Sequence, residues 1–283
     1  MDRMTLTCLL LVTAYSSVSA DYLSDRQQAM ALVVAGRHED ALATWVQMAK
    51  PPASEVQQSD ALHQAALCAV RLRQMDQALD FAGRIPLPSD SLACRLGILE
   101  SARRWSDMVE EFESVEIASW PERLRGEAYV SRGMAHYALQ NGREATRDFE
   151  AALKYLTDAN SLGNCSNLLG DVCRHVLMDD ERALAAYRQT YLIGTVYKQA
   201  QAAISAGEIL SQRKEFDAAL KGFDAIDLKD LTAPYWRGKL LCAHGRALAA
   251  IGKKAEAEAK FAEALALPEL PAMIRQECKE LRK

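Results

Sequence analysis

A short pattern recurs along the chain at intervals of about 36 residues, and it constrains the fold more than any other feature. Each copy is a small residue followed four positions later by a large ring. The clear copies are Ala41/Trp45, Ala145/Phe149, Ala183/Tyr187, Ala219/Phe223 and Ala257/Phe261, and weaker copies are Ala78/Ala82 and Met108/Phe112. A further small residue precedes five of the copies by twelve positions: Ala29, Ala66, Gly133, Gly207 and Gly245.

This spacing predicts pairs of packed helices. Residues four apart share one face of a helix, and a glycine or alanine where two helices cross lets their axes approach closely while a ring fills the groove beside it. The polar corners between the two helices, such as Gly36–Asp40, Gln140–Gly142 and Gly252–Lys254, carry glycines that we expect in the left-handed conformation. Only 14 glycines and 8 prolines occur, and no alternating strand pattern appears.

The copies resemble tetratricopeptide repeats, whose units are antiparallel helix pairs. The best match covers residues 238–268, where Gly245, Leu248, Gly252, Ala257, Phe261, Ala264 and Pro268 fit the family pattern. The resemblance implies an all-α fold, a right-handed α-solenoid of about seven antiparallel helix pairs. Residues 21–119 form repeats 1–3, which are degenerate, and residues 120–268 form repeats 4–7. Residues 269–283 are predicted to be a C-terminal capping helix, because the last repeat would otherwise expose its apolar face.

The first twenty residues have the features of a secretory signal peptide. Arg3 precedes an apolar stretch centred on Leu9–Val12, and Val18-Ser19-Ala20 is a small-x-small cleavage pattern that would leave Asp21 as the new terminus. The apolar part is shorter than the roughly 20 residues that span a bilayer. We therefore expect an exported chain, periplasmic or secreted, with a retained anchor as the alternative.

Six cysteines follow the leader, and an even number in an oxidising compartment permits disulfides. Their spacing does not choose among the 15 possible pairings. Cys165 and Cys173 are eight residues apart on one predicted helix, about 12 Å along its axis, which is too far for a disulfide. The alternative is that most are buried apolar residues. The six are Cys68, Cys94, Cys165, Cys173, Cys242 and Cys278.

No reactive constellation is visible in the sequence. It contains no phosphate-binding loop, dinucleotide fingerprint, zinc-protease or nucleophile-elbow motif, and its five histidines are scattered over separate repeats. The acidic run Asp179-Asp180-Glu181 is typical of a helix N-terminus. A net charge of −4 gives no general attraction to nucleic acid. We therefore predict no catalytic residues, no cofactor and no metal.

The remaining chemistry is on the surface. The resemblance implies that the first helices of the repeats line a concave groove that holds a peptide. Asn164, Asn167, Asp171 and Arg174 recur at three, four and three residues, which predicts one polar stripe along one helix. A solvated face is the alternative interpretation of this stripe. The predicted groove residues are Asp60, His63, Gln64, Arg71, Asp90, Met134, Tyr137, Asn164, Asn167, Asp171, Arg174, Lys239 and Arg246.

These observations favour a non-catalytic protein–protein interaction scaffold of the cell envelope that binds a protein or peptide along its groove. One alternative is an accessory subunit of a membrane-associated assembly, with the N-terminal segment retained as anchor. A second is a helical-toroid enzyme acting on glycans, which would need two carboxylates facing each other across a cavity.

Overall fold

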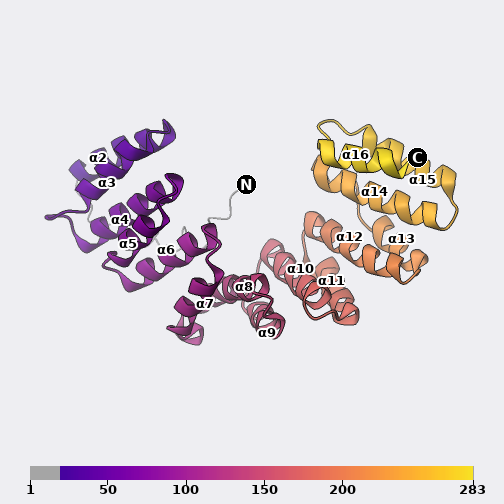
Figure 1. The fold of residues 1–283 in the computed structure, drawn as a ribbon, viewed down its shortest axis with the longest axis horizontal. Helices are drawn as coiled ribbons and strands as arrows, with labels where there is room; N and C mark the ends of the chain where they lie inside the picture. Colours follow the sequence, from indigo (N-terminus) through magenta and orange to yellow (C-terminus); the bar gives the residue numbers. More distant parts are fainter. Residues whose placement is uncertain (1–19, 283) are drawn as a thin grey trace. The chain divides into compact units, whose positions relative to one another are not determined.

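The computed structural model describes residues 20–282, which form helices and contain no strand. The predicted leader, residues 1–20, lies outside this part of the chain except for Ala20. The helices are labelled in Figure 1. In chain order they are α2 (Ala20–Val34), α3 (His38–Met48), α4 (Glu55–Arg71), α5 (Met75–Gly83), α6 (Pro88–Ser101), α7 (Trp105–Glu113), η3 (Ile117–Ser119), α8 (Glu122–Ala138), α9 (Gly142–Ala152), α10 (Ala159–His175), α11 (Asp180–Ile193), α12 (Val196–Gln212), α13 (Phe216–Asp224), α14 (Pro234–Ala250), α15 (Lys254–Leu265) and α16 (Ala272–Leu281).

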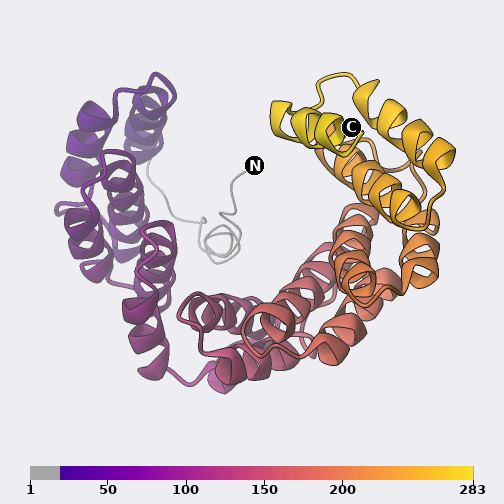
Figure 2. The same cartoon turned by 45° about the vertical axis from the view of Figure 1, so that its right-hand side comes forward.

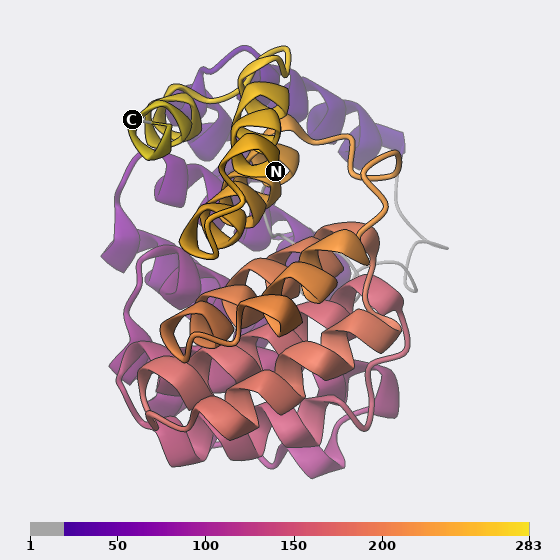
Figure 3. The same ribbon diagram turned by 90° about the vertical axis from the view of Figure 1, so that its right-hand side faces the viewer.

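The chain divides between Glu116 and Ile117 into two compact units. Unit 1 holds the pairs α2/α3, α4/α5 and α6/α7, drawn from indigo to purple in Figure 2. Unit 2 holds the pairs α8/α9, α10/α11, α12/α13 and α14/α15, followed by α16, and Figure 3 shows several of these helices as successive layers. The predicted all-α repeat architecture is confirmed for residues 20–282. The limits predicted for the repeat blocks stay a prediction.

In the helix pairs of unit 2, an aromatic ring on the second helix packs against a glycine on the first helix. A Cβ atom added to Gly133 would lie 2.9 Å from the Phe149 ring, and one added to Gly245 would lie 2.6 Å from the Phe261 ring. The corresponding rings of four other pairs are buried as well, namely Trp45, Phe112, Tyr187 and Phe223, while the α4/α5 pair has the buried Ala82 there. The recurring small-residue and ring pattern therefore marks the helix crossings, as predicted.

Local sequence explains where several helices begin. Ser54 caps α4 in a reciprocal pair with Gln57, whose backbone N–H donates to Ser54 Oγ at 3.3 Å while Ser54 N–H donates to Gln57 Oε1 at 2.8 Å. The Asp179 carboxylate accepts from Arg182 N–H at 3.0 Å, which confirms the capping role predicted for the acidic run. Pro88 and Pro234 lie in the first turns of α6 and α14, where a missing N–H costs nothing.

One corner differs from its prediction. Gly36 and Gly252 take positive φ angles of 75° and 80°, as expected, but in the α8–α9 corner the left-handed residue is Gln140, with φ 62°. Gly142 is instead the first residue of α9. It is required there for space, because a Cβ atom would lie 2.7 Å from the Leu177 side chain. The prediction that Gly142 closes the preceding helix was therefore wrong.

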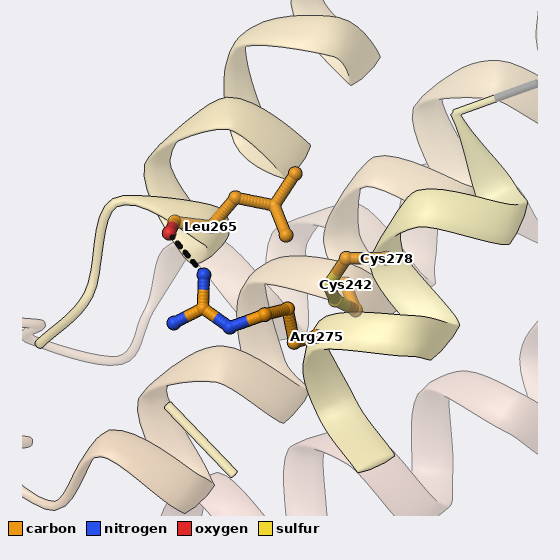
Figure 4. The surroundings of a disulfide bond; sticks show 4 residues. All are labelled: Cys242, Leu265, Arg275 and Cys278. Carbon is orange, nitrogen blue, oxygen red and sulfur yellow. Dashed lines mark hydrogen bonds between the residues drawn. A yellow bond between two sulfur atoms is a disulfide. The ribbon is translucent and has the colours of Figure 1, made fainter. Parts of the chain in front are cut away.

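A disulfide joins the last helix to the array. Cys242 of α14 and Cys278 of α16 are bonded, with their Cα atoms 5.8 Å apart, and both side chains are buried (Figure 4). Arg275 of α16 donates to the Leu265 carbonyl at 3.2 Å. Ile274 is fully buried against α14 and α15. Helix α16 therefore covers the apolar side of the last pair, and its outer side carries polar residues and the exposed Met273.

Candidate functional site: the first-helix face of unit 2

The first helices of the four pairs in unit 2, α8, α10, α12 and α14, lie one beside the next. They carry most of the predicted groove residues. We call this set, together with one residue that the prediction missed, the first-helix face. Its members are Met134, Tyr137, Asn164, Asn167, Asp171, Arg174, Glu208, Lys239 and Arg246.

The four residues of the predicted stripe lie on α10, and three of their side chains make hydrogen bonds to α12. Lys198 Nζ donates to Asn164 Oδ1 at 2.9 Å, and Asn167 Nδ2 donates to the Lys198 carbonyl at 3.1 Å. Asn167 is only 1% exposed. Its amide therefore serves the α10–α12 contact and is closed to a ligand in this structure, unlike the half-buried Asn164.

At the other end of the stripe, Arg174 takes part in a series of charged contacts that reaches α12 and α14. Arg174 Nη1 donates to Glu208 Oε2 at 3.0 Å and to the Ser205 carbonyl at 3.3 Å, both on α12. The second Glu208 oxygen lies 3.9 Å from Arg246 Nη2 on α14. The carboxylate of Glu208 thus connects two predicted residues from different helices. Glu208 was missed, although it directly follows Gly207 just as Arg246 follows Gly245.

Asp171 and Tyr187 form a partly buried pair beside this chain of charges. Tyr187 Oη donates to Asp171 Oδ1 at 2.7 Å. Burial raises the pKa of Asp171, although the Tyr187 hydrogen bond and the electrostatic interactions with His175 and Arg174 oppose this. Burial, and next the Asp171 charge, also raises the pKa of Tyr187, so its hydroxyl stays protonated and acts as the donor at neutral pH.

Three further predicted residues of unit 2 are half-buried. Met134 and Tyr137 lie on α8, and burial followed by the Asp171 charge raises the pKa of Tyr137. The Lys239 ammonium lies 5.6 Å from the centre of the Tyr235 ring, within reach of a cation–π contact. The side chain of Arg246 is 46% exposed. Cationic groups at the α14 end of the face are therefore open to a ligand.

The predicted residues of unit 1 have mixed environments. Asp60 is buried and accepts hydrogen bonds from Tyr22 Oη at 2.8 Å and from Arg26 Nε at 2.9 Å. His63 is 5% exposed, whereas Gln64 and Asp90 are half-buried and Arg71 is exposed. Asp60 and His63 therefore belong to the packing between helices, and only the other three are open to solvent.

The burial of His63 predicts acid sensitivity. Burial lowers its pKa below 6.5, against the charges of Asp60 and Asp90, so the folded chain prefers a neutral imidazole. Below pH 6.5 the unfolded chain binds this proton more readily, and we expect the free energy of unfolding to fall as the pH drops further, by at most about 1.4 kcal/mol per pH unit for this group. In urea titrations at a series of pH values, His63→Gln should lose less stability on acidification than the wild type. An equal loss in both proteins would show that His63 does not cause it.

Within residues 20–282, the cysteines outside the disulfide are buried, as the sequence alternative predicted. The four are Cys68, Cys94, Cys165 and Cys173. Burial, and next the charge of Asp90, raises the pKa of Cys94 to about 12, and burial followed by Glu127 does the same for Cys165. These two thiols are therefore protonated at neutral pH and are poor nucleophiles.

Two further properties concern residues 20–282 as a whole. No group of three or more histidine, cysteine, aspartate or glutamate residues in this range is placed to hold a metal ion. None of the helices in this range is long and apolar enough to cross a membrane.

Comparison with known proteins identifies the fold. No protein-family model matches the sequence, and a search of curated proteins finds no match. Solved structures do match, among them a tetratricopeptide repeat protein from Parabacteroides merdae, which is 15% identical with a TM-score of 0.54, covering 94% of this chain and 100% of that one. The C-terminal part of a TPR repeat-containing protein from Cytophaga hutchinsonii is 15% identical with a TM-score of 0.61, covering 89% and 98%.

The apo form of RapI is 12% identical with a TM-score of 0.53, covering 92% of this chain and 99% of that one. Sequence identities this low are evidence for the fold alone. Together with the helix pairs and their glycine–ring crossings, they show that this chain has the tetratricopeptide-repeat fold.

Proposed function

We propose that this protein is a non-catalytic scaffold that binds a protein or peptide segment across the first-helix face of unit 2. One observation carries the proposal. Arg174, Glu208 and Arg246 come from three successive first helices, and their charges meet on one surface. A segment lying across these helices would meet a prearranged series of charged and amide groups.

The arrangement suits an extended chain better than a small molecule. Side chains at equivalent positions of stacked helices are spaced by the distance between neighbouring helices, about 8–10 Å. That spacing matches every third residue of an extended segment, which advances about 3.3 Å per residue. Because Glu208 and Arg174 already hold each other, they lose little conformational freedom when a ligand binds, which favours affinity.

The α14 end of the face favours an acidic or amide-bearing part of the ligand. Arg246 has only a loose contact with Glu208, at 3.9 Å, and Lys239 lies two helical turns before it on the same helix. Both side chains can donate to carboxylate or carbonyl oxygens. At this end, Arg246 and Lys239 would thus recognise the ligand by hydrogen bonds to its backbone carbonyls and by attraction to its negative charge.

The proposed location is the cell envelope, after export. Two observations support it: the leader-like pattern of residues 1–20, and the disulfide between Cys242 and Cys278, a bond that persists mainly in oxidising compartments. An exported scaffold would meet its partner outside the cytoplasm.

A peptide-display selection tests the function. Residues 21–283 are immobilised, random peptides are selected against them, and the affinity of enriched peptides is measured by fluorescence anisotropy. Arg246→Ala should weaken binding about tenfold, because a charge-assisted hydrogen bond contributes roughly 1.5–3 kcal/mol. The matched control is Arg188→Ala, an exposed arginine on the second helix α11. If no peptide is enriched, or if both variants bind equally well, the proposal fails.

A further inference from the structure

Equivalent positions in two repeats hold a cation and a carboxylate as a pair. In the α8/α9 pair, Arg132 precedes the crossing residue Gly133, and Asp148 precedes the ring of Phe149. Arg132 donates to both oxygens of Asp148, from Nε at 2.9 Å and from Nη2 at 2.6 Å. In the α6/α7 pair, Arg95 and Glu111 occupy the same two positions, with Arg95 Nη2 2.9 Å from Glu111 Oε2.

The last repeat has bases at both of these positions. His244 precedes the crossing residue Gly245, and Lys260 precedes the ring of Phe261. The crossing itself is the same, since a Cβ atom on Gly245 would meet Phe261 as one on Gly133 would meet Phe149. An imidazole and an ammonium group cannot replace a cation–carboxylate pair. The carboxylate that the α6/α7 and α8/α9 pairs have at this position is therefore missing from the last repeat's own helices.

A cavity lies at this place. It has a volume of about 490 Å³ and is bounded by the end of α13, the following loop, α14 and α15. His244 and Lys260 both line it, and Phe223, Ile226, Leu240 and Leu241 form its apolar part. His244 is 6% exposed, and its ring lies tilted against that of Phe223, with the two ring centroids 5.7 Å apart. Its nearest acidic group is Asp224, whose Oδ1 lies 3.6 Å from Nε2.

The cavity carries both signs of charge. Asp224 and Asp227 lie on the α13–α14 side, while Lys229 and Lys260 supply two cations. Asp227 Oδ1 is already occupied by the Lys229 backbone N–H at 2.8 Å. Burial lowers the pKa of His244, against the charge of Asp224 and assisted by that of Lys260, while Glu263 and Glu256 oppose the shift. A neutral imidazole can donate through one nitrogen and accept through the other.

We propose that this cavity binds a small zwitterion of the amino-acid type with an apolar side chain. Its carboxylate lies between the His244 imidazole and the Lys260 ammonium, and so plays the part that Asp148 plays in the α8/α9 pair and Glu111 in the α6/α7 pair. Its ammonium group lies against Asp224, and its side chain packs on the apolar part of the cavity. A ligand with one charge alone would contact either Asp224 or Lys260 but not both, so we expect simple anions and simple amines to bind more weakly.

Isothermal titration calorimetry with L-leucine on the whole protein tests the proposal. The comparison ligands are 4-methylpentanoate, which lacks the ammonium group, isoamylamine, which lacks the carboxylate, and inorganic phosphate. Leucine should bind at least about tenfold more tightly than each of them, because each charge-assisted contact contributes at least this factor. Lys260→Gln should weaken leucine binding by about ten- to a hundredfold. The control Lys254→Gln changes an exposed lysine of the same helix outside the cavity.

A second variant separates loss of the site from loss of the fold. Lys260→Asp restores the residue type that Asp148 represents in the α8/α9 pair. It should abolish leucine binding, raise the melting temperature, and raise the pKa of His244 as followed by NMR. The proposal is overturned if leucine gives no heat at millimolar concentration, if phosphate binds more tightly than leucine, or if Lys260→Gln leaves the affinity unchanged.

Discussion

Replacing Gly245 with leucine is expected to destabilise unit 2 by about 3 kcal/mol or more, as overpacking of a tight crossing does. A Cβ atom at this position would already lie 2.6 Å from the Phe261 ring, and leucine adds three more carbon atoms. Phe261 is fully buried and cannot move aside without disturbing its neighbours. At about 2–4 °C per kcal/mol for a unit of this size, the melting temperature should fall by roughly 10 °C.

The same substitution at Gly222 is the matched control. Gly222 lies inside α13, and a Cβ atom there would meet nothing within 4 Å. Leucine favours helix over glycine by about 0.8–1 kcal/mol, so Gly222→Leu should leave the melting temperature unchanged or raise it. Differential scanning calorimetry of both variants makes the comparison. Equal melting temperatures would mean that Gly245 does not mark a helix crossing.

The crossing at Gly245 also shows why the fold could be predicted. Gly245, Ala257 and Phe261 lie close together in sequence, and their packing depends only on helix periodicity and on side-chain size. The pattern repeats, so each copy supports the others. Residues 57–118 were the least regular in sequence, yet Phe112 is fully buried at the expected position. A repeat can thus lose part of its pattern and keep the crossing.

The candidate site was harder to predict because a polar side chain on a helix face can be exposed to solvent, can bind a ligand or can bond to the neighbouring helix. The stripe of Asn164, Asn167 and Asp171 could be placed on one side of α10 from spacing alone. Which of them stays open depends on the neighbouring helix, and Asn167 is closed by the backbone of Lys198 on α12. Glu208 was missed, although its position after Gly207 repeats that of Arg246 after Gly245.

The disulfide lay beyond sequence reasoning for a related physical cause. Cys242 lies in a repeat helix and Cys278 in the capping helix, 36 residues apart, and they meet only because α16 packs back on α14. The pairing thus depends on how a helix outside the repeat pattern docks. Spacing alone excluded the Cys165–Cys173 pair and could choose none of the others.

The second large effect is expected from removing that disulfide. A cross-link that closes a loop of 36 residues lowers the entropy of the unfolded chain and stabilises the folded state by about 4 kcal/mol in the chain-entropy treatment. Cys242→Ala combined with Cys278→Ala should therefore lower the free energy of unfolding of unit 2 by about this amount. Helix α16 should be affected first, because its attachment then rests on Ile274, on the Arg275 bond to the Leu265 carbonyl and on the Arg282–Glu258 pair.

Hydrogen exchange measured by mass spectrometry locates the effect. In the double variant the amides of α16 should exchange faster than in the oxidised wild type, while those of α10 and α11 change little, because repeat units are stabilised mainly by their nearest neighbours. Reduced wild-type protein should behave like the double variant, and Cys173→Ala, which removes a free thiol, should keep α16 protected. The bond forms where thiols are oxidised. Export, as proposed, would therefore give the chain a last helix that is attached by the disulfide as well as by packing. Unchanged exchange in α16 would mean that apolar packing alone holds the last helix.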